Sequence, residues 1–210
     1  MKDWRLIYII FAKSEDKLYI SNKNRQAYFV LLSVCIIFVR INLKNCNVMF
    51  DKETYVQRRA LLKKNIGSGV LLFLGNDEQG LNYEDNAFRY RQDSTFLYYF
   101  GLSFAGLSAI IDIDEDKEII FGDELTIDHI VWMGTQPTLK EKSERVGIRE
   151  TLPSVAIISY LHKAVQKGQT VHYLPPYRPE HKLKLMDWLG IPPARQEGSV
   201  PFIRAVVAQR

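Results

Sequence analysis

The chain has 210 residues, enough for one sizeable domain and an extension, and 47% hydrophobic with 25% charged residues is typical of a globular protein. Residues 1–48 contain eight Lys/Arg and three Asp/Glu, which leaves 20 basic and 21 acidic side chains beyond them. A basic surface for nucleic acid is therefore not expected on the globular part. Both cysteines also lie in residues 1–48, so no disulfide framework or cysteine-bound metal is expected after them.

Residues 1–48 form an unusual first segment that contains no glycine and no proline. Its apolar run, Ala27–Val39, has 13 residues, fewer than the roughly 18–20 needed to cross a bilayer, so no membrane insertion is expected. Three interpretations of this segment are open: an anchor or signal, a buried helix, or sequence upstream of a true start at Met49. The third is favoured, because the composition resembles translated AT-rich DNA. We therefore expect an extension at 1–48 and a domain at 49–210.

Glycine and proline divide the rest of the chain into regular segments. A helix is expected from Asp51, its candidate N-cap, through Ile66, with a glycine after it. Val70–Leu74 is predicted to be a short buried strand, and the polar segment Gly75–Ala87 a loop. The buried stripe of the helix would comprise Tyr55, the stem of Arg59, Leu62 and Ile66.

The segment Phe88–Leu102 combines arginines, an amide and a carboxylate with a run of aromatic residues that ends at a glycine. Asp93 or Ser94 can cap a short helix here, with its rings facing a core. Arg91 and Gln92 would then lie at the edge of the packed surface as fixed hydrogen-bond donors. The rings expected in the core belong to Phe96, Tyr98, Tyr99 and Phe100.

Strands and helices alternate through the remainder of the chain. Leu107–Ile113 and Glu118–Gly122 are predicted to form a hairpin. The other expected elements are a helix from Thr138 to Gly147 with a capping box, a helix at Ser154–Gln166, a strand at Thr170–Leu174 and a helix at Pro179–Leu189. This order predicts a three-layer α/β/α domain, and the hairpin makes its sheet mixed rather than purely parallel.

No catalytic or metal-binding signature is present in the chain. The four histidines, His129, His162, His172 and His181, lie in separate elements without ligand spacing, and we expect ordinary surface or half-buried side chains. Nucleophile-elbow, phosphate-loop and metalloprotease helix motifs are also missing. The sequence therefore predicts no catalytic residue, no metal site and no cofactor within this chain.

Three segments carry a resemblance to a known family. Tyr-Val-Gln-Arg-Arg at Tyr55–Arg59, the segment Phe88–Leu102, and Ile-Val-Trp-Met-Gly at Ile130–Gly134 resemble the N-terminal domain of Xaa-Pro aminopeptidases (aminopeptidase P), of the creatinase/prolidase-like metallopeptidases. The resemblance covers 49–210 and implies the creatinase N-terminal, ribonuclease H-like fold. It also implies a C-terminal catalytic domain, which this chain lacks, holding a divalent metal pair, manganese, through two Asp, one His and two Glu.

The resemblance further implies a role in positioning substrate and in oligomerisation, within a cytoplasmic homo-oligomer that removes the residue preceding proline from peptides. The chain alone is then expected to be inactive. The residues that match the family's substrate contacts, some of them reaching a neighbouring subunit, are Trp132, Asp85 and Arg91.

Alternative interpretations remain for these residues and for the whole chain. Trp132 could be a core aromatic and Arg91 a buried ion-pair partner. The chain could also be a free-standing, non-catalytic domain that binds a partner protein, or the N-terminal domain of a prolidase or creatinase relative.

Overall fold

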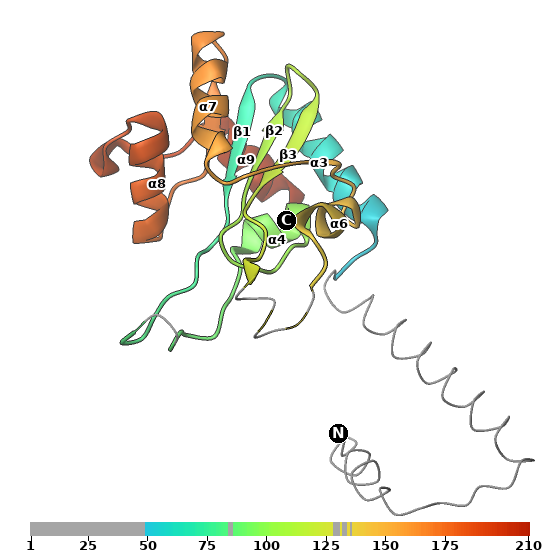
Figure 1. Ribbon diagram of the computed structural model, residues 1–210. Coiled ribbons are helices and arrows are strands. Elements are labelled where there is room, and N and C mark those ends of the chain that lie inside the picture. Colours follow the sequence, from blue (N-terminus) through green and yellow to red (C-terminus); the bar gives the residue numbers. More distant parts are fainter. Residues whose placement is uncertain (1–48, 84–85, 128–130, 132–133, 135) are drawn as a thin grey trace, which may run out of the picture. The chain divides into compact units, whose positions relative to one another are not determined.

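The computed structural model describes residues 49–83, 86–127, 131, 134 and 136–210, all within one compact unit. The extension expected at 1–48 lies outside the described residues. In the described part, strands form one sheet with helices packed on both of its faces (Figure 1). None of the helices described in this part is long and apolar enough to cross a membrane.

The sheet is mixed, with an antiparallel centre and parallel edges. Its strands lie in the order β4-β3-β2-β1-β5, where β2 pairs antiparallel with both β1 and β3, while β5 and β4 pair in parallel with β1 and β3. The hairpin predicted from the sequence is confirmed as β2–β3. The strands are β1 (Val70–Leu74), β2 (Ser108–Asp112), β3 (Lys117–Phe121), β4 (Glu150–Leu152) and β5 (Val171–Tyr173).

Helices cover the two faces unequally. On one face, α3, α4, α6 and α9 contribute to a core with the sheet, and on the other α7 and α8 do so. A short 3-10 helix, η1, precedes the last α-helix. The helices are α3 (Lys52–Ile66), α4 (Ser94–Phe100), α6 (Leu139–Glu144), α7 (Ala156–Gln166), α8 (Pro179–Leu189), η1 (Pro193–Arg195) and α9 (Val200–Gln209).

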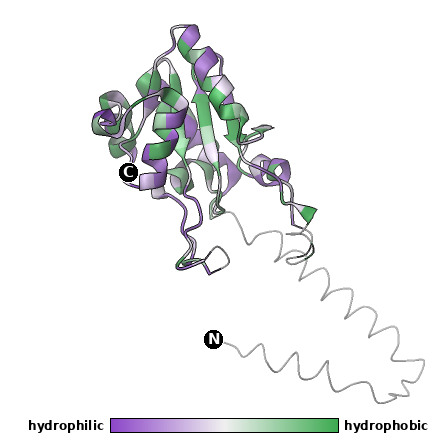
Figure 2. Ribbon diagram, turned by 60° about the vertical axis from the view of Figure 1, so that its left-hand side comes forward, coloured by the Kyte–Doolittle hydropathy of each residue, from purple (hydrophilic) through white to green (hydrophobic). Residues whose placement is uncertain are grey.

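Alternation along the strands creates two apolar cores. In β1, Leu71 and Phe73 face one core, whereas Val70 and Leu72 face the other. Because both faces are covered, β1 is a continuous apolar run and the middle of β2 is apolar as well, so the centre of the sheet is mostly green in Figure 2, while the helices carry both colours. The three-layer α/β/α architecture with a mixed sheet is confirmed.

The aromatic residues of Phe88–Leu102 are mainly core, as the sequence predicts. The ring of Phe73 lies 5.0 Å from that of Phe100 and 5.1 Å from that of Phe202 on α9, both edge-on. Tyr99 is also fully buried, whereas Tyr98 is only partly buried. These contacts join α4 and α9 to the sheet.

Several predicted helix boundaries need correction. The helix expected to run to Gly147 ends at Glu144, because two tight turns follow it and Gly147 adopts a φ of 87°. The helix expected from Ser154 begins at Ala156, because the preceding residues form tight turns in which Ala156 and Ile157 donate to the carbonyls of Pro153 and Ser154. The predicted capping box at Thr138 is confirmed.

Of the two candidate caps of α4, the structure selects Asp93. Its carboxylate accepts hydrogen bonds from the backbone N–H groups of Thr95 and Phe96, at 2.8 and 2.9 Å, and one from the hydroxyl of Tyr177 at 3.0 Å. Ser94 is the first helical residue and is exposed. Gly101 ends the helix in the left-handed conformation, where an added Cβ would lie 2.4 Å from the ring of Tyr55.

Replacing Asp93 by alanine is expected to cost about 1–2 kcal/mol of unfolding free energy, because the N-terminal amides of α4 lose their acceptor. Ser94→Ala serves as the matched control and is expected to cost less than about 0.5 kcal/mol. Urea unfolding of both variants measures the difference. Equal losses would show that Asp93 is not the cap that matters.

Candidate functional site

The most prominent feature outside the core is an arm formed by residues 77–89, of which 77–83 and 86–89 are described. It connects β1 to α4 and projects from one edge of the sheet (Figure 1). Its two sides are joined along its length, where the N–H of Phe88 donates to the carbonyl of Gln79 at 2.8 Å, and that of Leu81 to the carbonyl of Asn86 at 2.7 Å. The predicted loop is therefore a paired, hairpin-like arm.

The arm carries three large apolar side chains that are not packed against the domain. Leu81, Tyr83 and Phe88 are 51%, 62% and 57% exposed. Single exposed apolar residues are ordinary on a protein surface, but three on one projecting segment are typical of a contact surface.

A second loop, of which residues 122–127, 131, 134 and 136–138 are described, leaves the same edge of the sheet. Since β1 and β3 both pair antiparallel with β2, they run in the same direction and their carboxyl ends share one edge. Figure 1 shows the described parts of both loops on this side. The described part of the loop exposes two more apolar residues, Ile127 and Val131. The two loops together form the candidate functional edge.

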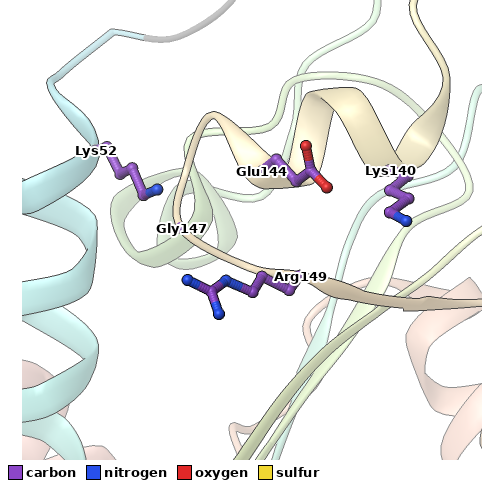
Figure 3. Close-up of a pocket in the computed structure, with 5 residues that line it drawn as sticks. All are labelled: Lys52, Lys140, Glu144, Gly147 and Arg149. Carbon is purple, nitrogen blue, oxygen red and sulfur yellow. The ribbon is translucent and has the colours of Figure 1, made fainter.

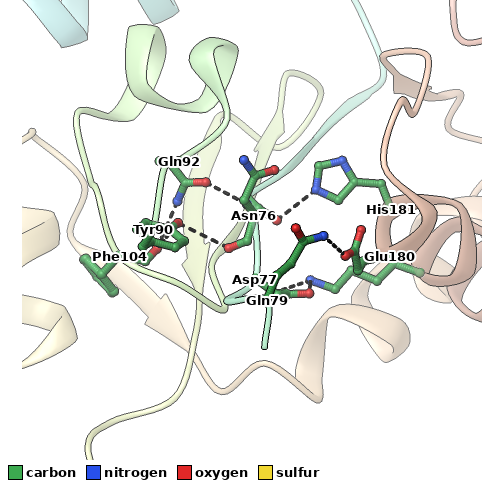
Figure 4. A network of polar contacts seen from close by, with 10 residues as sticks. Asn76, Asp77, Gln79, Tyr90, Gln92, Phe104, Glu180 and His181 are labelled. Atoms are coloured by element: carbon green, nitrogen blue, oxygen red, sulfur yellow. Dashed lines mark hydrogen bonds and ion pairs between the residues drawn. The ribbon is translucent and has the colours of Figure 1, made fainter. Parts of the chain in front are cut away.

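Gln92 anchors the base of the arm. Its side-chain oxygen accepts from the backbone N–H groups of Asn76 at 2.7 Å and Asp93 at 2.9 Å, and its amide nitrogen donates to the carbonyl of Phe104 at 3.0 Å (Figure 4). Only 1% of Gln92 is exposed, so the expected position at the surface edge is wrong. The amide is buried because it hydrogen-bonds backbone groups of three segments that have no partner in the sheet.

Two further residues complete this side of the base. The hydroxyl of Tyr90 lies 2.8 Å from the carbonyl of Phe104 and 3.2 Å from that of Asn76, and the amide of Asn76 donates to the carbonyl of Arg91 at 2.8 Å. Burial, with nearby carboxylates, raises the pKa of the Tyr90 hydroxyl, so it remains a donor at neutral pH. Both ends of the arm are thus hydrogen-bonded to each other.

Helix α8 contacts the segment that leads from β1 into the arm, on the side opposite Gln92 (Figure 4). His181 contacts the carbonyl of Gly75 at 3.1 Å, and the ammonium of Lys184 lies 2.7 Å from the carboxylate of Asp77. Gln79 also donates to Glu180. Burial lowers the pKa of His181, so the ring is neutral at pH 7 and its Nε2 must carry the hydrogen that faces this carbonyl. His181 is therefore a buried, bonded side chain, rather than the surface or half-buried one expected.

The structure places only one of the three predicted contact residues. Arg91 is exposed at the base of the arm and forms no ion pair with another described residue, which removes the buried ion-pair alternative. Asp85 and Trp132 lie outside the described residues. The contribution of α8 was missed, since nothing in its sequence indicates which loop it contacts.

No metal centre can be built from the described residues, because no group of three His, Cys, Asp or Glu side chains among them is placed to hold an ion. A divalent metal pair therefore does not fit this part of the chain. The candidate functional edge instead presents a partly apolar surface, on an arm whose base is fixed by hydrogen bonds.

Comparison with known proteins supports a family assignment. Residues 55–173 match the family described as "Aminopeptidase P, N-terminal domain". A Chaetomium globosum protein described as "Probable Xaa-Pro aminopeptidase" is 30% identical over 112 residues, which is 51% of this chain and 18% of that protein. A human protein described as "Xaa-Pro dipeptidase" is 33% identical over 90 residues, 41% of this chain and 18% of that protein. The chain thus spans less than a fifth of these relatives.

Solved structures share the fold. The structure of Pseudomonas aeruginosa aminopeptidase PepP aligns with 72% of this chain and 35% of its own, with a TM-score of 0.59 and 21% identity. A variant of Escherichia coli aminopeptidase P aligns with 76% of this chain and 33% of its own, with a TM-score of 0.55 and 15% identity. With a family match over more than half of its length, the chain belongs to the aminopeptidase P N-terminal domain family.

Proposed function

We propose that residues 49–210 are the substrate-positioning and oligomerisation domain of a cytoplasmic Xaa-Pro aminopeptidase, which removes the N-terminal residue preceding proline, and that 1–48 is an extension. The divalent pair, manganese in this proposal, would belong to a C-terminal catalytic domain. The single observation that carries the proposal is the candidate functional edge, with its exposed apolar side chains on an arm held at both sides of its base.

A held arm is suited to docking. Its base is joined through Gln92 to Asn76, Asp93 and Phe104, and through His181 to α8, so little backbone freedom remains to be lost there on binding. Its exposed apolar residues supply area that a partner surface would remove from water. We infer that the partner is the catalytic domain of its own chain or of a neighbouring subunit in a homo-oligomer.

Within this proposal, the three contact residues have separate roles. Asp85, in the arm, would offer a carboxylate to the free amino terminus of the peptide. Trp132, in the second loop, would pack against the substrate, and Arg91 would provide a cation at the base of the arm.

A second candidate function is supported by the human relative. Its printed description as a dipeptidase, at 33% identity, favours a prolidase-type parent as an alternative. A creatinase parent, or a free-standing domain that binds another protein, are the remaining alternatives.

The test is purification of the endogenous protein with an antibody against this domain, followed by intact-mass measurement and peptide assays. We expect a mass well above the 24.4 kDa of this chain. We also expect hydrolysis of an Xaa-Pro tripeptide, which should be lost when metal is chelated and restored by Mn²⁺. Cleavage of only the Xaa-Pro dipeptide would favour the prolidase alternative. A mass of 24.4 kDa without hydrolysis would favour the free-standing domain.

A further inference from the structure

A hollow of about 350 Å³ lies where α3 begins and α6 leads into β4. Three of its lining residues are cationic, from segments far apart in sequence, and one is anionic (Figure 3). The lining residues are Lys52, Lys140, Glu144, Gly147 and Arg149.

The cations of this hollow have no ionic partner among the described residues. The ion pairs of the domain involve other lysines and arginines, and Glu144 does not pair with Lys52, Lys140 or Arg149. Figure 3 shows the side chains of Lys52 and Arg149 ending near Gly147, whereas Lys140 lies on the far side of Glu144. Gathering three cations against one carboxylate leaves an excess of two positive charges, which an anion would offset.

The frame that carries these side chains is well defined. Gly147 adopts a φ of 87°, and a Cβ there would lie 2.6 Å from Val56 on α3, so only glycine allows this close approach. The carbonyl of the preceding residue, Val146, accepts a hydrogen bond from the buried Arg59 at 2.9 Å. The backbone between α6 and Arg149 is therefore held against the first turns of α3.

A second hollow, of about 370 Å³, provides an internal comparison. It is lined by three lysines as well, but Lys117 and Lys167 lie 3.5 and 2.7 Å from the carboxylate of Glu115, and Asp112 adds another acidic group. Lys163 is its third cation. The two hollows are alike in size and in number of cations, and differ in whether those cations are neutralised.

We propose that the hollow at Lys52, Lys140 and Arg149 is a binding site for a phosphate group of a small molecule. A dianionic group matches the excess of two charges. The guanidinium of Arg149 and the ammonium of Lys52, which end near Gly147, supply donors that phosphate oxygens accept, and Lys140 adds a third positive charge to the lining. The proposal rests on the lining of this hollow, and it does not depend on the proposed peptidase role.

The test uses the purified chain and inorganic phosphate, titrated by calorimetry at neutral pH and low ionic strength. Saturable binding at one site per chain is expected, and the backbone amide signals of Gly147 and Arg149 should shift in NMR spectra during the titration. The variant Lys52→Gln/Lys140→Gln/Arg149→Gln should bind at least about tenfold more weakly, since its attractive charges are gone. All three side chains are exposed, so the fold should be retained.

The matched control is Lys117→Gln/Lys163→Gln/Lys167→Gln, which removes the same charge from the second hollow and should leave the affinity for phosphate within about twofold. Equal losses in the two variants would overturn the proposal, because they would show a response to net charge alone. Absence of saturable binding, or shifts confined to other residues, would also overturn it. Acetate, a monoanion, should bind at least about tenfold more weakly than phosphate. Equal affinity for acetate would contradict the assigned ligand class.

Discussion

Replacing Arg59 by alanine is expected to destabilise the domain by about 3–5 kcal/mol, the largest effect of any single change considered, because it removes one partner of a buried ion pair. Arg59 on α3 is 0% exposed. Its Nε lies 2.8 Å from the carboxylate of Glu118, and its two terminal nitrogens donate to the carbonyls of Tyr99 and Val146 at 2.9 Å each. One side chain thus joins α3 to β3, to α4 and to the segment after α6.

The loss would come from the groups left behind. Two buried carbonyls would lack a donor, and Glu118 would retain only Lys63, 3.1 Å away. Arg59→Lys should recover part of the stability, since an ammonium keeps the charge but cannot reach three acceptors in a planar arrangement. Urea unfolding measures both variants against Lys64→Ala, an exposed change on the same helix that should cost less than about 0.5 kcal/mol. A loss below about 1 kcal/mol for Arg59→Ala would contradict this assignment.

Replacing Gln92 by leucine, which has a similar size, is expected to cost about 2–4 kcal/mol, because buried groups at the base of the arm lose their partners. These are the N–H groups of Asn76 and Asp93 and the carbonyl of Phe104. Hydrogen exchange should also quicken at Asn76 more than at amides in the centre of β2. Unchanged stability and exchange would show that Gln92 does not hold the arm.

Gln92→Glu separates the accepting and donating roles of this side chain. A carboxylate can still accept from the two N–H groups, but it cannot donate to the carbonyl of Phe104. Burial should raise the pKa of the new carboxyl above its unfolded value of about 4.3. The stabilisation by the protonated form is then fully present below that unfolded pKa, and it is lost as pH rises through the folded pKa. The variant should therefore approach wild-type stability only in acid, as measured by urea unfolding at several pH values.

Much of the fold could be predicted because its boundaries are marked by local chemistry. Asp93 is a cap that uses only its own neighbours, and Gly190 ends α8 in the left-handed conformation expected of a terminal glycine. The strand β4 was not predicted, since three residues are too few to show an alternating pattern. Helix α9 was missed as well, although Ser199 followed by a proline in the first turn is a recognisable start signal.

The candidate site was predictable only in part, because long-range contacts decide it. The sequence indicated that Arg59 would bury its stem, yet its whole guanidinium is enclosed by partners 40 to 87 residues away. Gln92 was singled out correctly as a fixed side chain, but its burial depends on Asn76 and Phe104, in other segments. The contacts between α8 and the base of the arm cannot be predicted from residue spacing along the chain. The same is true of the unpaired cations near Gly147.

The central claim is that the candidate functional edge acts on peptide turnover, and the most direct measurement is kcat/KM for an Xaa-Pro tripeptide in the complete endogenous protein. The variant Leu81→Ser/Tyr83→Ser/Phe88→Ser removes the exposed apolar groups of the arm, while Val155→Ser/Val165→Ser/Leu183→Ser removes exposed ones next to α7, on α7 and on α8. We expect kcat/KM of the arm variant to fall at least about tenfold, which corresponds to roughly 1.4 kcal/mol of transition-state stabilisation, while its Tm stays unchanged. The control variant should remain fully active. Full activity of the arm variant, or equal losses in both variants, would contradict the central claim.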